Sequence, residues 1–140
     1  MNRPRILMAD DHRIVAEGLR SLLEPEFELI EIVEDGVQMV EAAKRLSPDV
    51  ILADITKPRL NGLEALERLR EANCKAKVVF LTMHKDATYA DRALRAGASG
   101  FVLKHSASSE LVKAIRESLM GRTYVTPAVA ESLNQRPVSR

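Results

Sequence analysis

Apolar residues along the chain follow two alternating patterns. Five short segments carry apolar residues at consecutive positions, as in strands covered on both faces; they are residues 5–9, 28–33, 49–54, 77–81 and 100–103. Between them, apolar residues recur three or four positions apart, which predicts amphipathic helices over residues 12–24, 37–46, 63–72, 86–96 and 106–120. The sequence therefore predicts five strands that alternate with five helices.

This alternation predicts an α/β fold with a parallel sheet, helices on both faces and right-handed crossovers. The expected class is the flavodoxin-like (βα)5 doubly wound sheet of five strands in the order 2-1-3-4-5. Glu28 and Glu31 interrupt the second apolar segment, so we expect this strand to be less buried, as at an edge. After the fifth helix, residues 122–140 contain Thr126-Pro127, a short helical stretch at 128–133 and a polar end, which predicts a linker.

Composition narrows the classes of partner. With 140 residues, 46% of them hydrophobic, the chain suits one domain with a sizeable core. Its 21 basic and 20 acidic residues give a net charge of +1, and hence no general attraction to nucleic acid. Cys74 is the single cysteine, which excludes an internal disulfide. No apolar run approaches the roughly 18 residues of a membrane span, and no apolar signal segment is present, so we expect a soluble, cytoplasmic protein without a membrane partner.

Four of the five predicted strands end in residues that can do chemistry. These residues are Asp10-Asp11, Asp54, Thr82 and Lys104. Each alone has a structural explanation, because acids and threonine cap helices and strands, and a lysine can be an ordinary surface residue. In the order 2-1-3-4-5, however, these strand ends meet at one edge of the sheet, where α/β proteins bind ligands. If each had only a structural role, three like charges would be crowded together without a reason. Their joint presence therefore favours a functional site.

Three carboxylates and one ammonium group suit phosphoryl transfer. The acids offer the oxygen ligands that Mg²⁺ accepts. Asp54 can be the nucleophile toward phosphorus, since carboxylates form aspartyl-phosphate intermediates. Lys104 and Thr82 can neutralise charge on the phosphoryl oxygens. A zinc site built on His12, His84 and His105 is disfavoured, because no ligand spacing joins them and no cysteine pairs with them.

Several stretches of the chain resemble one known family. They are Asp10-Asp11-His12 with Glu17-Gly18-Leu19, Asp54 with Pro58 and Gly62, Leu81-Thr82-Met83-His84, Ala96-Gly97-Ala98, and Gly100-Phe101-Val102-Leu103-Lys104. Over about residues 5–120 the chain resembles the receiver domain of bacterial two-component response regulators. More narrowly, it is similar to the NarL/FixJ-like branch with LuxR-type output, and its tail is similar to the interdomain linker of that branch.

The resemblance implies a role for each residue of the site. It implies that Asp54 is the phosphoacceptor and that Asp10 and Asp11 bind Mg²⁺. The backbone carbonyl of Thr56 is implied as a further metal ligand, and Lys104 as the cation beside the phosphoryl group.

The resemblance also implies a switch. Thr82 is similar to the hydroxyl that moves toward the phosphoryl group, and Phe101 is similar to the aromatic side chain whose rotamer follows that move. Phe101 is equally well explained as a plain core aromatic.

Two positions depart from the common pattern of the family. Lys57 stands where many receivers have methionine and would add positive charge near the phosphate. His105 follows Lys104 where a proline is frequent, although the NarL-like branch commonly lacks that proline. The sequence therefore leaves the orientation of the Lys104 side chain undetermined.

The expected function is a switch rather than an enzyme. A sensor histidine kinase would donate a phosphoryl group to Asp54 with Mg²⁺, and the face of the fourth helix, fifth strand and fifth helix would change shape. We expect a receiver at residues 1–121 and, at 122–140, a linker toward a C-terminal output domain outside this chain. A longer regulator that contains this receiver is expected to form a phosphorylation-dependent homodimer and to contact DNA only through that output domain.

Three alternatives stay open. The chain can be a stand-alone receiver, or an interaction module that no longer takes phosphate, although all five key residues are present. It can also be a Mg²⁺-dependent phosphohydrolase with an aspartyl nucleophile. Such enzymes usually place a second acid two residues after the nucleophile, and here that position is Thr56.

Overall fold

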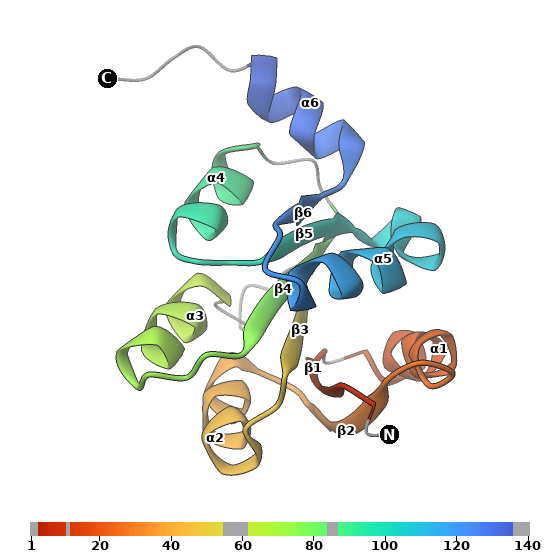
Figure 1. The fold of residues 1–140 in the computed structure, drawn as a ribbon, viewed down its shortest axis with the longest axis vertical. Helices are drawn as coiled ribbons and strands as arrows, with labels where there is room; N and C mark the ends of the chain where they lie inside the picture. Colours follow the sequence, from red (N-terminus) through yellow and green to blue (C-terminus); the bar gives the residue numbers. More distant parts are fainter. Residues whose placement is uncertain (1–2, 11, 55–61, 84–86, 136–140) are drawn as a thin grey trace.

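The structure is a computed structural model that describes residues 3–10, 12–54, 62–83 and 87–135, in which strands and helices alternate (Figure 1). The strands are β1 (Arg5–Ala9), β2 (Glu28–Val33), β3 (Val50–Asp54), β4 (Lys77–Thr82), β5 (Gly100–Leu103) and β6 (Tyr124–Val125). The helices are α1 (Arg13–Leu23), α2 (Gly36–Leu46), α3 (Gly62–Glu71), α4 (Ala87–Arg95), α5 (Ala107–Leu119) and α6 (Pro127–Gln135), with a 3-10 turn η1 (Lys104–Ser106) before α5. Within these ranges, no helix has the length and apolar content needed to cross a membrane.

All six strands form one parallel sheet in the order β2-β1-β3-β4-β5-β6. The predicted order 2-1-3-4-5 is confirmed, and a short sixth strand that the sequence pattern did not predict extends it. β2 lies at an edge, and Glu28 is exposed there, as the interrupted apolar segment indicated. β3, at the centre, is buried at all five positions, which explains its run of consecutive apolar residues.

The helices cover the two faces of the sheet and make two cores (Figure 1). On one face, α1 and α5 pack through side chains such as Leu23 and Leu111. On the other, α2, α3, α4 and α6 contribute buried residues such as Leu66, Ala90 and Val129. Because both faces of the central strands are covered, we look for polar chemistry at the ends of these strands.

Residues 124–135 continue the fold after α5 through β6 and α6. The short helical stretch expected at 128–133 lies within α6, whereas β6 comes from residues that showed no strand pattern. Val129 of α6 is fully buried in the same core as α4. The division into a receiver at 1–121 and a separate tail stays a prediction.

Candidate functional site

The candidate site lies at the carboxyl ends of β1, β3, β4 and β5. In the sheet, Ala9 is the register partner of Ala53, so Asp10 and Asp54 follow on neighbouring strands. Asp54 in turn pairs with Leu81 of β4, directly before Thr82. The fold therefore brings strand ends that are far apart in the sequence to one place, as the order 2-1-3-4-5 requires.

Lys104 and Asp54 form an ion pair at this edge. The Nζ atom of Lys104 donates a hydrogen bond to Oδ2 of Asp54. The side chain of Asp54 is 2% exposed and that of Lys104 is 13% exposed, so water screens this pair poorly. Lys104 is the first residue of η1, directly after β5, and the strand end therefore aims its ammonium group at the carboxylate.

Asp10 is the second buried carboxylate of the site. Its Oδ1 accepts a hydrogen bond of 2.8 Å from the backbone N–H of His12, whereas its Oδ2 is buried without a hydrogen-bond donor among the described residues. Burial first, and the neighbouring charge of Asp54 second, raise the pKa of Asp10, against the opposing effects of the His12 N–H and Lys104. An additional cation would reduce the repulsion between the buried carboxylates of Asp10 and Asp54.

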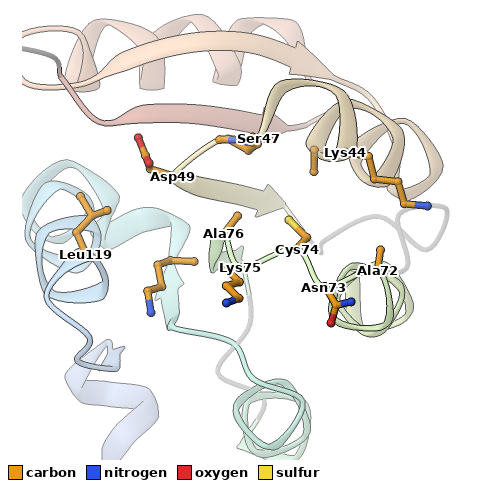
Figure 2. A pocket seen from close by; sticks show the side chains of 12 residues that line it. Lys44, Ser47, Asp49, Ala72, Asn73, Cys74, Lys75, Ala76 and Leu119 are labelled. Atoms are coloured by element: carbon orange, nitrogen blue, oxygen red, sulfur yellow. The ribbon is translucent and has the colours of Figure 1, made fainter.

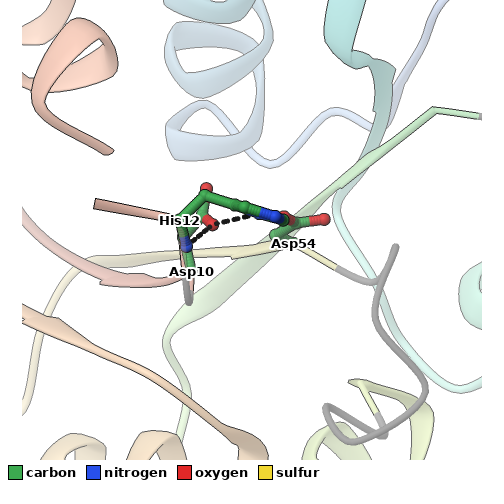
Figure 3. Close-up of side chains that lie close together, drawn as sticks. All are labelled: Asp10, His12 and Asp54. Carbon is green, nitrogen blue, oxygen red and sulfur yellow. Dashed lines mark hydrogen bonds and ion pairs between the residues drawn. The ribbon is translucent and has the colours of Figure 1, made fainter. Parts of the chain in front are cut away.

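His12 completes a group of three possible ligands (Figure 3). One ligand atom each from Asp10, His12 and Asp54 can be chosen so that all three lie within 4.8 Å of one another. The Nδ1 atom of His12 is 3.6 Å from Oδ1 of Asp10. The sequence places His12 in a stretch that resembles the family and in a disfavoured zinc site, but it does not predict His12 as a ligand here, because nothing in the spacing shows that its ring lies beside Asp10.

The two predicted switch residues are both buried. Thr82 is 5% exposed at the end of β4, and Leu103 of β5 is its register partner. Phe101 is fully buried, and its ring centroid lies 6.5 Å from that of Tyr89 on α4, with the two rings tilted by 44°. Phe101 is thus a core aromatic that also contacts the helix expected to respond to phosphorylation.

Some of the predicted residues lie outside the described part of the chain. They are Asp11, Thr56, Lys57 and His84. His105 is described: it is exposed in η1 and does not belong to the three-residue ligand group.

A cavity of about 640 Å³ lies at the opposite edge of the sheet and belongs to a different environment (Figure 2). Its lining includes Lys44, Ser47, Asn73, Cys74 and Lys75, from the chain that ends α2 and α3. Helix C-termini present carbonyl groups and favour cations, so the lysines here are explained by the helix ends. Neither Asp10 nor Asp54 lines this cavity.

The residues at the carboxyl ends of β1, β3 and β5 together can carry out a definite kind of chemistry. The site holds a buried carboxylate on Asp54, a group that is able to attack phosphorus, together with a cation on Lys104 and a second carboxylate on Asp10 that can hold a divalent cation. A phosphoryl group that reacts with Asp54 would meet fixed positive charge, which is what phosphoryl transfer chiefly requires.

Comparison with known proteins agrees with this chemistry. Residues 6–116 match the response regulator receiver domain family. The chain is 38% identical over 134 residues to the transcriptional regulatory protein DegU of Brevibacillus brevis, a match that covers 94% of this chain and 57% of that protein. It spans less than two thirds of the length of the first curated relatives that it matches.

Two solved structures are similar over nearly the whole chain. A LuxR-family two-component response regulator from Aurantimonas sp. SI85-9A1 gives a TM-score of 0.90 with 34% identity, and the match covers 96% of this chain and 97% of that one. The signal receiver domain of the response regulator NarL from Mycobacterium tuberculosis gives 0.81 with 29% identity, over 87% of this chain and all of that one.

Proposed function

We infer the function from one premise, which is that the chain belongs to the response regulator receiver domain family. We propose that Asp54 accepts a phosphoryl group from a sensor histidine kinase and that the resulting acyl phosphate changes the conformation of the domain. The observation that carries this proposal is the ion pair between Lys104 and the buried Asp54. It places a compact, flexible cation where a phosphorylated Asp54 would carry its negative charge.

The residues present fit a magnesium ion. Asp10 and Asp54 would hold it, because they form a buried pair of carboxylates with one Asp10 oxygen lacking a donor among the described residues. The family resemblance adds Asp11 and the backbone carbonyl of Thr56. When bound, the ion would neutralise charge on the phosphoryl oxygens.

The chain's own residues then have distinct tasks. In the transfer, a bond forms between an Asp54 carboxylate oxygen and phosphorus, while the bond from phosphorus to the donor nitrogen breaks and its electron pair stays on the donor. The Lys104 ammonium turns from the carboxylate to the new phosphoryl oxygens. Thr82, one strand away, supplies a hydroxyl for the same group.

The readout we propose runs through β5 and α4. Movement of Thr82 toward the phosphoryl group would leave space for Phe101, whose ring contacts Tyr89 of α4. The altered α4-β5-α5 face would favour a homodimer and control a DNA-binding output domain, in keeping with relatives named as transcriptional regulators. Residues 1–121 would then be the receiver, and the chain after them would lead to the output domain.

A labelling experiment with an acyl phosphate donor tests the function. We expect the chain to take up one phosphoryl group per molecule with Mg²⁺ and none after chelation of the metal. Multiple turnover of small phosphomonoesters would instead make the protein a phosphohydrolase. A lack of label together with a lack of Mg²⁺ binding would favour an interaction module that takes no phosphate.

A separate prediction concerns the metal and Asp10. Asp10→Asn keeps an oxygen for the His12 N–H but removes a buried charge beside Asp54. We expect Mg²⁺ affinity, measured by calorimetry, to fall about tenfold or more, which is at least ~1.4 kcal/mol. The free energy of unfolding without Mg²⁺ should rise, because repulsion between the two carboxylates is removed.

Asp35→Asn is the matched control for that prediction. Asp35 follows β2 and caps α2 by accepting a 2.8 Å hydrogen bond from the Gln38 N–H, a task that asparagine performs equally well. The control should leave Mg²⁺ affinity unchanged. Equal Mg²⁺ affinity in wild type and Asp10→Asn would remove Asp10 from the metal site.

A further inference from the structure

The segment of β6 and α6 is joined to β5 by backbone hydrogen bonds. The Tyr124 N–H donates to the Ser99 carbonyl at 3.0 Å, and the Thr126 N–H donates to the Phe101 carbonyl at 3.0 Å. Val129 is fully buried in the core that also contains Phe101. The C-terminal segment therefore lies directly on the strand that leads to Lys104.

Tyr124 anchors the same segment to α5. Its hydroxyl donates a 2.8 Å hydrogen bond to Oε1 of Glu110, and the Lys113 ammonium lies 6.0 Å from its ring centroid. Burial, and then the hydrogen bond to Glu110, raise the pKa of Tyr124 to about 12. The segment is thus held on both sides of β5.

Thr126 makes an unusual use of its hydroxyl. A threonine directly before a helix commonly accepts a hydrogen bond from the first turn of that helix through its side chain. Here the N–H groups of Val129 and Ala130 bond to the backbone carbonyl of Thr126, both at 2.9 Å. Its Oγ1 instead accepts a 3.0 Å hydrogen bond from the backbone N–H of Leu103, and the residue is only 3% exposed.

This bond extends the β5-β6 ladder by one step beyond the two residues of β6. Phe101 and Leu103 are two apart, so their backbone groups face the same neighbouring strand. The Thr126 N–H donates a hydrogen bond to the Phe101 carbonyl, and the Thr126 hydroxyl accepts one from the Leu103 N–H. Both bonds lie where the chain turns into α6. Without that oxygen, the buried Leu103 N–H would lose the acceptor that the structure provides.

Leu103 in turn fixes the start of η1. It is the extended residue before that turn, with φ −73° and ψ 136°, and the next residue is Lys104. The Lys104 ammonium pairs with Asp54. A continuous path of one hydrogen bond, one peptide bond and one ion pair thus runs from Thr126 to Asp54.

We propose that Thr126 is a positioning residue for Lys104, through which the chemistry at Asp54 and the docking of β6 and α6 influence each other. The inference rests on the proposed function, because it gives Lys104 a task at a phosphorylated Asp54. Coupling of this kind is reciprocal. If the docking of β6 and α6 changes the free energy of phosphorylation at Asp54, then phosphorylation, by drawing Lys104 away from its present position, changes the free energy of that docking by the same amount.

The test is a matched set of substitutions. Thr126→Val keeps the branched shape and approximate volume but removes the acceptor, Thr126→Ser keeps the hydroxyl, and Thr123→Val makes the same chemical change at an exposed position. We expect the maximal rate constant for phosphorylation by an acyl phosphate donor to fall about tenfold in Thr126→Val. The donor concentration at half-maximal rate should stay within about twofold, since Thr126 does not touch the donor.

Rescue separates positioning from damage to the fold. Thr126→Ser and Thr123→Val should both phosphorylate within about twofold of wild type. A wild-type maximal rate in Thr126→Val would overturn the positioning role while leaving Asp54 as phosphoacceptor. Absence of label in the wild type would overturn the proposed function itself, which is a different result.

A second measurement uses the unsubstituted chain and does not depend on any variant folding. Hydrogen exchange at the Leu103 amide, and at amides of residues 126–131, is compared before and after saturation with donor and Mg²⁺. Reciprocal coupling predicts a change of about tenfold in exchange rate, equivalent to ~1.4 kcal/mol. Unchanged exchange at all these amides in fully phosphorylated protein would overturn the coupling.

Discussion

Asp54→Asn protein takes up no phosphoryl label from an acyl phosphate donor with Mg²⁺, while the wild type is labelled to one group per chain. The amide is close in shape to the carboxylate and still accepts a hydrogen bond from Lys104. It lacks the nucleophilic oxygen that attacks phosphorus, so the chemistry is lost while the contact persists.

A control at the other end of the same strand isolates the effect. Asp49 is exposed, and its Oδ2 accepts a 2.8 Å hydrogen bond from the Arg5 N–H, which asparagine can also accept. Asp49→Asn should be labelled like the wild type. Full labelling of Asp54→Asn would show that another side chain is the phosphoacceptor.

Lys104→Met has the second large effect, and it acts on both stability and chemistry. Substitution removes the cation that pairs with the buried carboxylate of Asp54 and lies near Asp10, which should lower the free energy of unfolding by about 3 kcal/mol. The rate of phosphorylation should fall about a hundredfold, because one fixed positive group at the developing charge is lost. Urea unfolding and labelling kinetics measure the two effects.

Lys75→Met serves as the comparison for Lys104. Lys75 is an exposed residue that lines the cavity at the opposite edge of the sheet. Its substitution should change stability by less than ~0.5 kcal/mol and leave labelling intact. If Lys104→Met unfolds at the same urea concentration as this control, the Lys104-Asp54 pair does not stabilise the fold.

Much of the fold follows from local patterns. β3 shows five consecutive buried positions, and only a central parallel strand needs apolar residues on both faces. Once strand order is known, the meeting of Asp10, Asp54 and Lys104 is a geometric consequence of parallel strands. The sequence therefore predicts that Asp10, Asp54 and Lys104 meet, whereas the places of Asp11 and Thr56 stay predictions.

The C-terminal segment could not be predicted in the same way. β6 has two residues, too few for a period of two to appear, and it forms because β5 offers an edge. The Thr126 hydroxyl bonds to β5 rather than to its own helix, which no propensity reveals. The position of the His12 ring, with Nδ1 3.6 Å from Oδ1 of Asp10, is likewise known only from the folded structure.

The most direct measurement locates the phosphoryl group itself. An acyl phosphate on an aspartate is reduced by borohydride to homoserine, a change of mass that peptide sequencing by mass spectrometry assigns to one residue. After phosphorylation and reduction, we predict homoserine at position 54 and unmodified aspartate at position 10. Homoserine at another position, or no homoserine in protein that carries label, would contradict Asp54 as the phosphoacceptor.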